Sequence, residues 1–262
     1  MLFIPRNDIR IGNDARFQGQ GPQALWLKRA PRLKPHFEAG IIRIAEAAKS
    51  FPKKQSGPAM LEKIKEYALN HPRLYQLSQS FFAPGASRAL HDRIKNAAAR
   101  LPPAKLILDV GCGPSSQLFQ LGLKPLGVDI CFPYVLRYIS QGYGAIMASA
   151  EALPFESQSF DGIWSTALFH HLSDQVAREA IHEFMRVAAS PGYVVILDWV
   201  SPRKNWKRPL APIIQFLDRG KFVRSQEEME ALLPDRKAWV IERFSYSATG
   251  LEMVLCRYLK KP

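Results

Sequence analysis

The sequence predicts an α/β protein built on a doubly wound, mostly parallel sheet of seven strands. Short, continuously apolar segments alternate with amphipathic segments of helical period, as in parallel sheets covered on both faces. The first apolar segment ends in a Gly-rich turn, which is typical of a ligand-binding strand-to-helix junction. The chain of 262 residues is 47% hydrophobic, enough for one full core. The expected strands are 106–108, 126–130, 145–148, 163–166, 193–199, 238–244 and 251–258.

The remaining segments predict three further parts. Residues 1–35 are rich in Pro, Gly and Gln without periodicity, which predicts a loosely ordered basic arm. Residues 36–101 carry apolar residues at helical spacing, which predicts a helical cap. Residues 102–262 form the α/β domain, with an insert at 201–235. Its clearest helix carries Val176 to Val187 on one face and is predicted to stop at Pro191.

Composition limits the class of protein. No apolar segment reaches about 18 residues, and the amino terminus lacks a signal-peptide pattern, so we expect a cytoplasmic protein. Cys112, Cys131 and Cys256 are scattered, which disfavours disulfides and metal sites and favours small buried side chains.

Charge is distributed unevenly. Residues 1–100 hold 18 Lys and Arg against 7 Asp and Glu, whereas residues 101–200 hold 5 against 9. Residues 201–262 hold 13 against 7. The basic outer parts indicate either an anionic partner or a solvated basic surface.

The Gly-rich turn Asp109–Gly113 carries the chemistry. Its glycines permit a tight turn and close approach of backbone N–H groups to a ligand, with a helix expected from about Ser115. Asp129 ends the next strand, where a carboxylate can accept both hydroxyls of a ribose. A dinucleotide site would need a third glycine where Ser116 stands. Asp109 would also repel a pyrophosphate, so a ligand carrying positive charge fits better.

Four stretches in order, ILDVGCGP, GVDI, SAEALPFESQSFDGIWSTALFHHL and EFMRVAASPGYVVILDW, resemble the class I methyltransferases of the quinone-biosynthesis and biotin-pathway type. The resemblance covers about residues 104–200. It implies S-adenosylmethionine as cofactor and a structural role for Asp161. The cofactor-binding residues that it implies are Asp109, Gly111, Cys112, Gly113, Asp129, Ile130, Ser149, Ala150, Glu151 and Leu168.

Two residues depart from the family pattern. Ser115 stands where glycine is common, and Ser149 stands where an aspartate often contacts the adenine amine. A hydroxyl bonds more weakly than a carboxylate, so cofactor affinity could be modest. A non-catalytic binding scaffold is therefore a further alternative.

His170 and His171 are the candidate catalytic residues, because histidine titrates near neutral pH. A packing role for one of them, and a helix-capping role for the other, is the alternative. In the insert, Leu210, Ile213, Ile214 and Leu217 form an apolar stripe between basic residues. This pattern predicts a lid over the acceptor or, alternatively, peripheral contact with a membrane surface.

Two acceptor classes fit the sequence. The favoured one is a small-molecule or lipid-like acceptor, anionic or apolar, because the cap and insert are rich in Phe, Trp and Ile. The alternative is RNA, held by the basic amino-terminal third. Against RNA, Ala167-Leu168-Phe169-His170 replaces the Asn-Pro-Pro-aromatic turn common among enzymes that methylate base amines.

Overall fold

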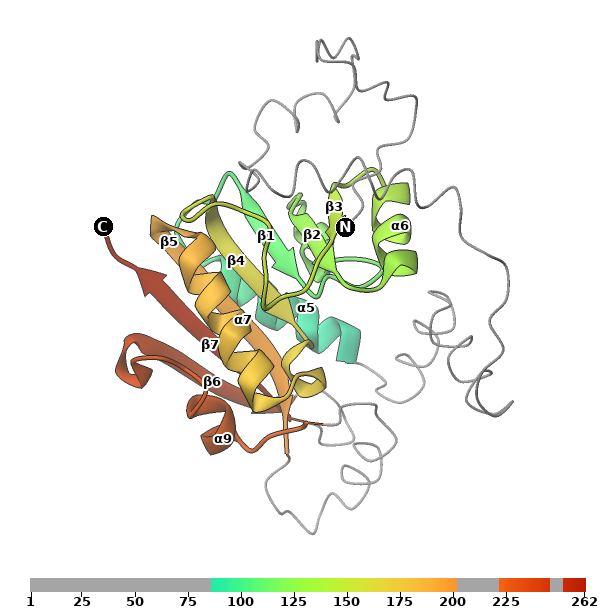
Figure 1. Cartoon of the computed structure of the whole chain (residues 1–262). Coiled ribbons are helices and arrows are strands. Elements are labelled where there is room, and N and C mark those ends of the chain that lie inside the picture. The colour runs from blue at the N-terminus through green and yellow to red at the C-terminus, as the bar shows by residue number, and fades with distance from the viewer. Residues whose placement is uncertain (1–85, 202–221, 246–251) are drawn as a thin grey trace, which may run out of the picture.

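A computed structural model of the chain describes residues 86–201, 222–245 and 252–262. Seven strands form a single sheet in the order β3-β2-β1-β4-β5-β7-β6, as Figure 1 shows. β7 runs antiparallel to both of its neighbours, and the strands from β3 to β5 run parallel. The predicted fold class is confirmed. The strands are β1 (Ile107–Val110), β2 (Leu126–Asp129), β3 (Ala145–Met147), β4 (Phe160–Thr166), β5 (Ala188–Val200), β6 (Trp239–Ser245) and β7 (Glu252–Lys260).

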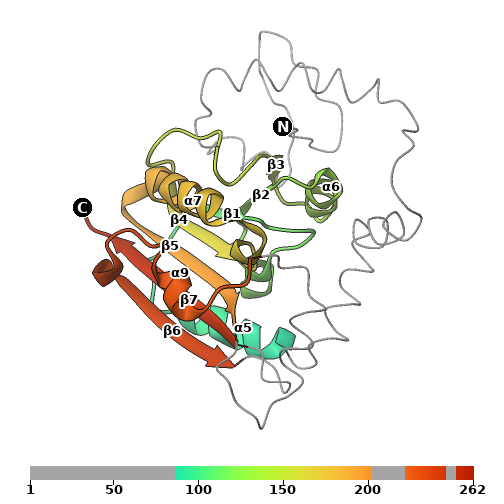
Figure 2. The same cartoon turned by 60° about the horizontal axis from the view of Figure 1, so that its bottom comes forward.

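Helices cover both faces of the sheet (Figure 2). One face carries α5 (Ala86–Ala98), the 3₁₀ helix η1 (Gln117–Leu121) and α6 (Phe132–Ser140). The opposite face carries α7 (Asp174–Val187) and α9 (Gln226–Glu230). Two further 3₁₀ helices lie in the connections, η2 (Phe169–His171) and η3 (Arg236–Ala238).

The period of two along each strand divides the core between the two faces. Leu108 and Val110 of β1 pack on the α7 side, whereas Ile107 packs on the α5 side with Ile94 and Ala97 of that helix. All five side chains are buried, so each face of β1 is sealed by a helix. α5, which lies inside the predicted cap, thus packs directly on the sheet. The division into arm, cap and domain stays a prediction.

Two predicted helix boundaries were wrong. The helix expected from Ser115 is only the short 3₁₀ helix η1, which Ser116 caps and which Gly122 ends in a left-handed conformation. The helix expected to stop at Pro191 ends at Val187 instead, because residues 188–192 already extend as β5. Ser173 caps the start of that helix by accepting the N–H of Val176.

Several predicted segments lie outside the described residues. They are the arm 1–35, the cap as far as residue 85, and the apolar stripe of the insert at 210–217. Within the described ranges, no helix has the length and apolar character needed to cross a bilayer.

Candidate functional site

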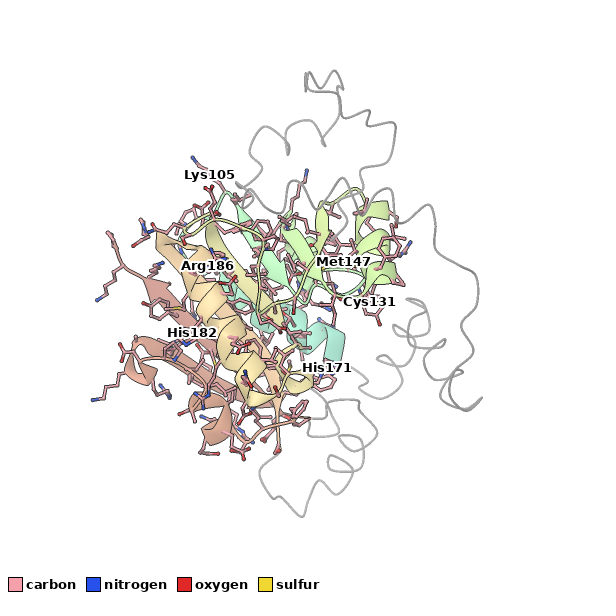
Figure 3. All side chains as sticks on the ribbon, in the orientation of Figure 1. Lys105, Cys131, Met147, His171, His182 and Arg186 are labelled. Carbon is pink, nitrogen blue, oxygen red and sulfur yellow. The ribbon has the colours of Figure 1, made fainter. Side chains whose placement is uncertain are left out.

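The predicted site residues meet at the carboxyl edge of the parallel strands. Asp109 to Gly113 end β1, Asp129 ends β2, and Leu168 follows β4. Cys131, Met147 and His171, labelled in Figure 3, follow or end three of these strands, whereas Lys105 precedes β1 at the opposite edge. In open α/β sheets, ligands bind at this carboxyl edge. The structure therefore brings together residues that the sequence spreads over 60 positions or more.

The Gly-rich turn is tied to β2 through its own backbone. The N–H groups of Gly111 and Cys112 both donate to the carbonyl of Val128, at 2.8 and 3.1 Å. The N–H of Gly113 donates to Oδ2 of Asp129 at 2.9 Å. The expectation of bare N–H groups aimed at a ligand was therefore wrong for these three. They fix the turn against the neighbouring strand instead.

The two glycines of the turn are needed for different reasons. Both have positive φ, +72° at Gly111 and +59° at Gly113. A Cβ on Gly111 would lie 2.9 Å from Cδ1 of Leu168, so this glycine allows Leu168 to close over the turn. A Cβ on Gly113 would meet no heavy atom of the described residues within 4 Å. The space in front of Gly113 is thus where a ligand can approach the backbone.

Two carboxyl groups lie at this turn, the buried Asp109 and the half-buried Asp129. Burial raises the pKa of Asp109 from its usual 3.8 to about 7, a hydrogen bond from Ser116 lowers it, and the nearby Asp129 carboxylate raises it further. Burial also raises the pKa of Asp129, against backbone hydrogen bonds from Cys131, Gly113 and Ile130 that lower it. A ligand that brings positive charge would stabilise both carboxylates in their ionised form.

The side chains after β2 and β3 border the same space. Ile130 is 72% exposed, unusual for a large apolar residue, and directly follows Asp129. Ser149 is half-buried, Ala150 is buried and Glu151 is exposed in the turn after β3. An apolar surface beside polar groups suits a purine ring. The roles that the resemblance implies for these residues therefore stay predictions.

Ser115, one of the two departures from the family pattern, takes part in holding the turn. The Ser115 hydroxyl donates to the side-chain oxygen of Gln141 at 3.2 Å, and Gln141 donates to the carbonyl of Pro114 at 2.8 Å. Ser115 therefore joins the turn to the end of α6, which glycine cannot do.

The carboxylate of Asp161 accepts the N–H groups of Lys105 and Leu106, in agreement with its expected structural role.

The turn after β4 forms the other end of the site. Ala167 has a φ of +57°, a left-handed conformation that a residue with a Cβ adopts only under constraint. Its N–H is held by the carbonyl of Leu197 at 2.8 Å. This strained position directs the following Leu168 over Gly111.

Asp198, which the sequence analysis missed, anchors this turn. Its carboxylate lies 2.7 Å from Nδ1 of His170 and also accepts the N–H groups of Phe169 and Trp199. Both side chains of the His170–Asp198 pair are almost wholly buried. His170 further stacks on Trp199, with ring centroids 4.4 Å apart, and contacts the ring of His171 at 3.9 Å. His170 is thus a buried, fixed side chain, and neither histidine caps α7, a role that Ser173 takes.

Arg224, which forms a β-bridge with Val200 at the end of β5, binds the same turn. Its guanidinium donates to the carbonyls of Phe169 and Leu172 at 2.8 and 2.6 Å and pairs with Asp174. The N–H of Phe222 donates to the carbonyl of His170 at 3.0 Å. The described end of the insert is therefore attached to the acceptor side of the site. A buried arginine among basic surface residues gives no sequence signal of this role.

A second loop is fixed by an ion pair between Glu183 and Arg186 of α7. Glu183 accepts the N–H of Leu153 at 2.8 Å, and Arg186 donates to the carbonyls of Phe155 and Leu153. The two side chains also pair with each other. The spacing of three residues that joins the pair on α7 also directs both groups at the loop after Glu151.

The chain matches the family model described as a methyltransferase domain over residues 108–196. It is 30% identical over 176 residues to the probable tRNA methyltransferase 9B of Bos taurus, covering 66% of this chain and 35% of that protein. It is 34% identical over 110 residues to the tRNA (carboxymethyluridine(34)-5-O)-methyltransferase of Arabidopsis thaliana, covering 40% of this chain and 26% of that one. The chain therefore spans between about a quarter and about a third of the length of these two relatives.

A solved structure has the same fold. The SAM-dependent methyltransferase TM1293 of Thermotoga maritima superposes with a TM-score of 0.57 at 16% identity. The match covers 74% of this chain and 99% of that one. At this level of identity the likeness concerns the fold alone.

Proposed function

We propose that this chain, which belongs to the class I S-adenosylmethionine-dependent methyltransferases, transfers a methyl group to an oxygen of a modified uridine in tRNA. The observation that carries the proposal is the likeness to two relatives named as tRNA methyltransferases. The sequence alone favoured a small-molecule or lipid-like acceptor, and the comparisons favour the RNA alternative instead.

The sequence argument against RNA concerned a different acceptor atom. An Asn-Pro-Pro-aromatic turn serves the methylation of a base amine. A carboxymethyl group on uridine ends in a carboxylate that is already ionised at neutral pH. Its oxygen attacks without a general base, so the turn Ala167–His170 suits an oxygen acceptor. The reaction forms a methyl ester and breaks the bond between sulfur and the methyl carbon.

The described residues fit the cofactor. Its ammonium and sulfonium groups suit the carboxylates of Asp109 and Asp129, and the open space at Gly113 leaves room for it beside the turn. Asp129 would hold the ribose, and Ile130 would border the adenine. When bound, the cofactor supplies a methyl group that is activated by positive sulfur.

The protein's own part is positioning and the exclusion of water. Leu168 closes over Gly111 and forms an apolar wall beside the reacting centre. Asp198 and Arg224 hold the turn that carries Leu168 and His170. In this account His170 positions the acceptor side and does not abstract a proton. In place of the catalytic role predicted for His170 and His171, we propose that these residues position the acceptor.

The test is transfer of labelled methyl from S-adenosylmethionine to bulk tRNA, compared with a lipid and quinone extract. A methyl ester releases labelled methanol in mild alkali, whereas methyl groups on nitrogen or carbon stay bound. Alkali-labile label in tRNA supports the proposal. Label in the extract alone would restore the small-molecule acceptor. Alkali-stable label in tRNA, whether on nitrogen, on carbon or as an ether on oxygen, would contradict the carboxylate acceptor.

Peripheral contact with a membrane, an open expectation from the insert, would appear as pelleting with anionic vesicles.

A further inference from the structure

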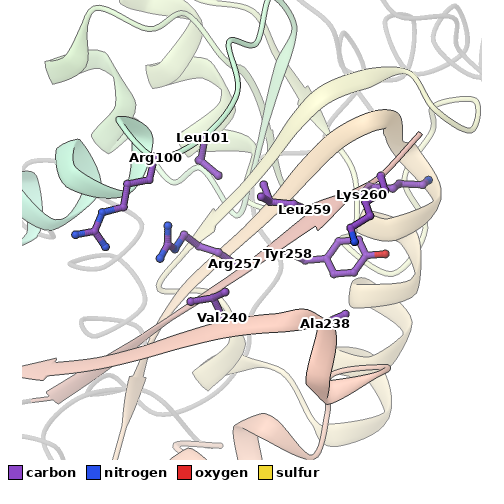
Figure 4. Close-up of a pocket in the computed structure, with 9 residues that line it drawn as sticks. Arg100, Leu101, Ala238, Val240, Arg257, Tyr258, Leu259 and Lys260 are labelled. Carbon is purple, nitrogen blue, oxygen red and sulfur yellow. The ribbon is translucent and has the colours of Figure 1, made fainter.

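A basic pocket lies at the amino edge of the sheet, opposite the candidate site. It encloses about 710 Å³, within the range of roughly 300–1,000 Å³ common for ligand pockets. Arg100 and Leu101 border it where α5 gives way to β1, and Val240 and Arg257 border it from the neighbouring strands β6 and β7 (Figure 4). No residue of the proposed cofactor site lines it.

The charges of the pocket are not balanced among the described residues. Arg100 and Arg257 both pair with a single oxygen, Oε1 of Glu242. Lys261 adds an exposed ammonium group. Nε of Arg257 is buried without a hydrogen-bond partner in the described part of the chain. A buried donor that lacks a partner costs on the order of 1–3 kcal/mol, which an anion placed there would recover.

The floor of the pocket is formed by exposed apolar side chains. Val240 is 55% exposed and Leu259 is 52% exposed. Leu259 lies two residues beyond Arg257 on β7, on the same face of the sheet that α5 covers further along. α5 ends at Ala98, so this end of the face has no helix over it among the described residues. Cations beside an apolar floor match one chemical unit, a phosphate next to a ribose or base.

We propose that this pocket is a second contact site for RNA, with phosphate at Arg100, Arg257 and Lys261 and a base or ribose against Val240 and Leu259. The proposal rests on the proposed function and identifies a surface that holds the tRNA away from its reacting nucleotide. Leu197 pairs with the end of β4 beside the site, and Gly192 pairs with Lys260 at the pocket. Five residues of strand separate them, about 17 Å at roughly 3.3 Å per residue. A folded RNA spans that distance while its acceptor stays in the site.

The experiment compares full-length variants in binding to bulk tRNA over a series of salt concentrations. The pocket variant carries Arg100→Gln and Lys261→Gln, and its matched control carries Arg88→Gln and Lys124→Gln, which remove the same charges from exposed positions outside the pocket. Each lost phosphate contact lowers the slope of log affinity against log salt by roughly 0.7 to 0.9. We expect the pocket variant to lose a slope of about 1.5 and about tenfold in affinity at low salt, with unchanged affinity for S-adenosylmethionine.

A second variant, Val240→Glu, adds a carboxylate to the floor at an exposed position and should weaken tRNA binding at least as much. If both pocket variants bind tRNA as the control does, the pocket is not an RNA contact and the inference is wrong. If wild-type protein methylates tRNA in that case, the proposed function stands without it. If wild-type protein neither binds nor methylates tRNA, the proposed function and this inference both fail.

Discussion

Replacing Asp109 by asparagine should reveal a buried carboxyl group that destabilises the protein without its cofactor. Burial raises the pKa of Asp109 to about 7, whereas its pKa in the unfolded chain is near the usual 3.8. Between these two values the folded state binds a proton that the unfolded state has lost. The free energy of unfolding therefore falls as pH rises from about 4 to 7, and the loss is complete above pH 7.

The magnitude follows from the size of the pKa shift. Each pKa unit corresponds to about 1.4 kcal/mol, so a shift of roughly 3 units lowers the stability of the wild-type protein by about 4 kcal/mol above neutral pH. Asparagine has the same shape and carries no proton to lose. Relative to wild type, Asp109→Asn should gain up to about 4 kcal/mol between pH 4 and pH 7.

Urea unfolding of both proteins at pH values from about 5 to 8 measures this difference. We expect the two curves of unfolding free energy against pH to diverge and then run parallel above pH 7. The cofactor should reverse the preference, because its positive groups favour the ionised carboxylate. Wild-type affinity for S-adenosylmethionine should rise from pH 6 to pH 8, and the variant should bind weakly at both. Curves that stay parallel over the whole range would refute the reasoning.

Four further substitutions test the site. Asp129→Ala should weaken S-adenosylmethionine binding by on the order of 1.5–3 kcal/mol in calorimetric titration, while Glu156→Gln, at an exposed position, should not; equal affinities would remove Asp129 from the site. Gly113→Ala should cost only about 1 kcal/mol of stability but should impair cofactor binding, because its Cβ would meet no protein atom yet would enter the ligand's space. Gly111→Ala should destabilise more by thermal unfolding, since its Cβ would meet Leu168; a reversed order would contradict the geometry. Asp198→Asn should lower kcat by about tenfold to a hundredfold with little change in cofactor affinity, because it loosens the turn on the acceptor side; a loss of cofactor affinity alone would place Asp198 elsewhere in the account.

The sheet could be predicted from the sequence because its strands are continuously apolar. Three residues of these strands are fully buried, as strands covered on both faces require: Leu108, Val128 and Ile163. The tight turn after β1 could also be predicted, because Gly111 and Gly113 both adopt positive φ. The ends of the helices were harder to predict. Residues 188–192 carry Pro191 and Gly192, which stop a helix by pattern, yet β5 begins before them because β4 offers a pairing edge.

The groups that hold the acceptor side could not be predicted, because their roles come from tertiary contacts. Asp198 lies near the end of an apolar strand, where a polar residue is common, and its contact with His170 joins residues 28 positions apart in the sequence. Arg224 is one of many basic residues in its segment, and only burial distinguishes it. The acceptor class also could not be predicted from one turn. The residues Ala167–His170 disfavour the methylation of a base amine, and they leave an oxygen acceptor in RNA open.

The central claim is that the site at Asp109–Gly113 and Asp129 serves the methylation of a uridine in tRNA. The most direct test is mass spectrometry of nucleosides from tRNA incubated with S-adenosylmethionine and either wild-type protein or Asp129→Ala. The account predicts that wild-type protein converts carboxymethyluridine to a nucleoside heavier by one methylene and sensitive to alkali, and that the variant converts much less. Unchanged nucleosides with the wild-type protein, or equal conversion by both proteins, would contradict it.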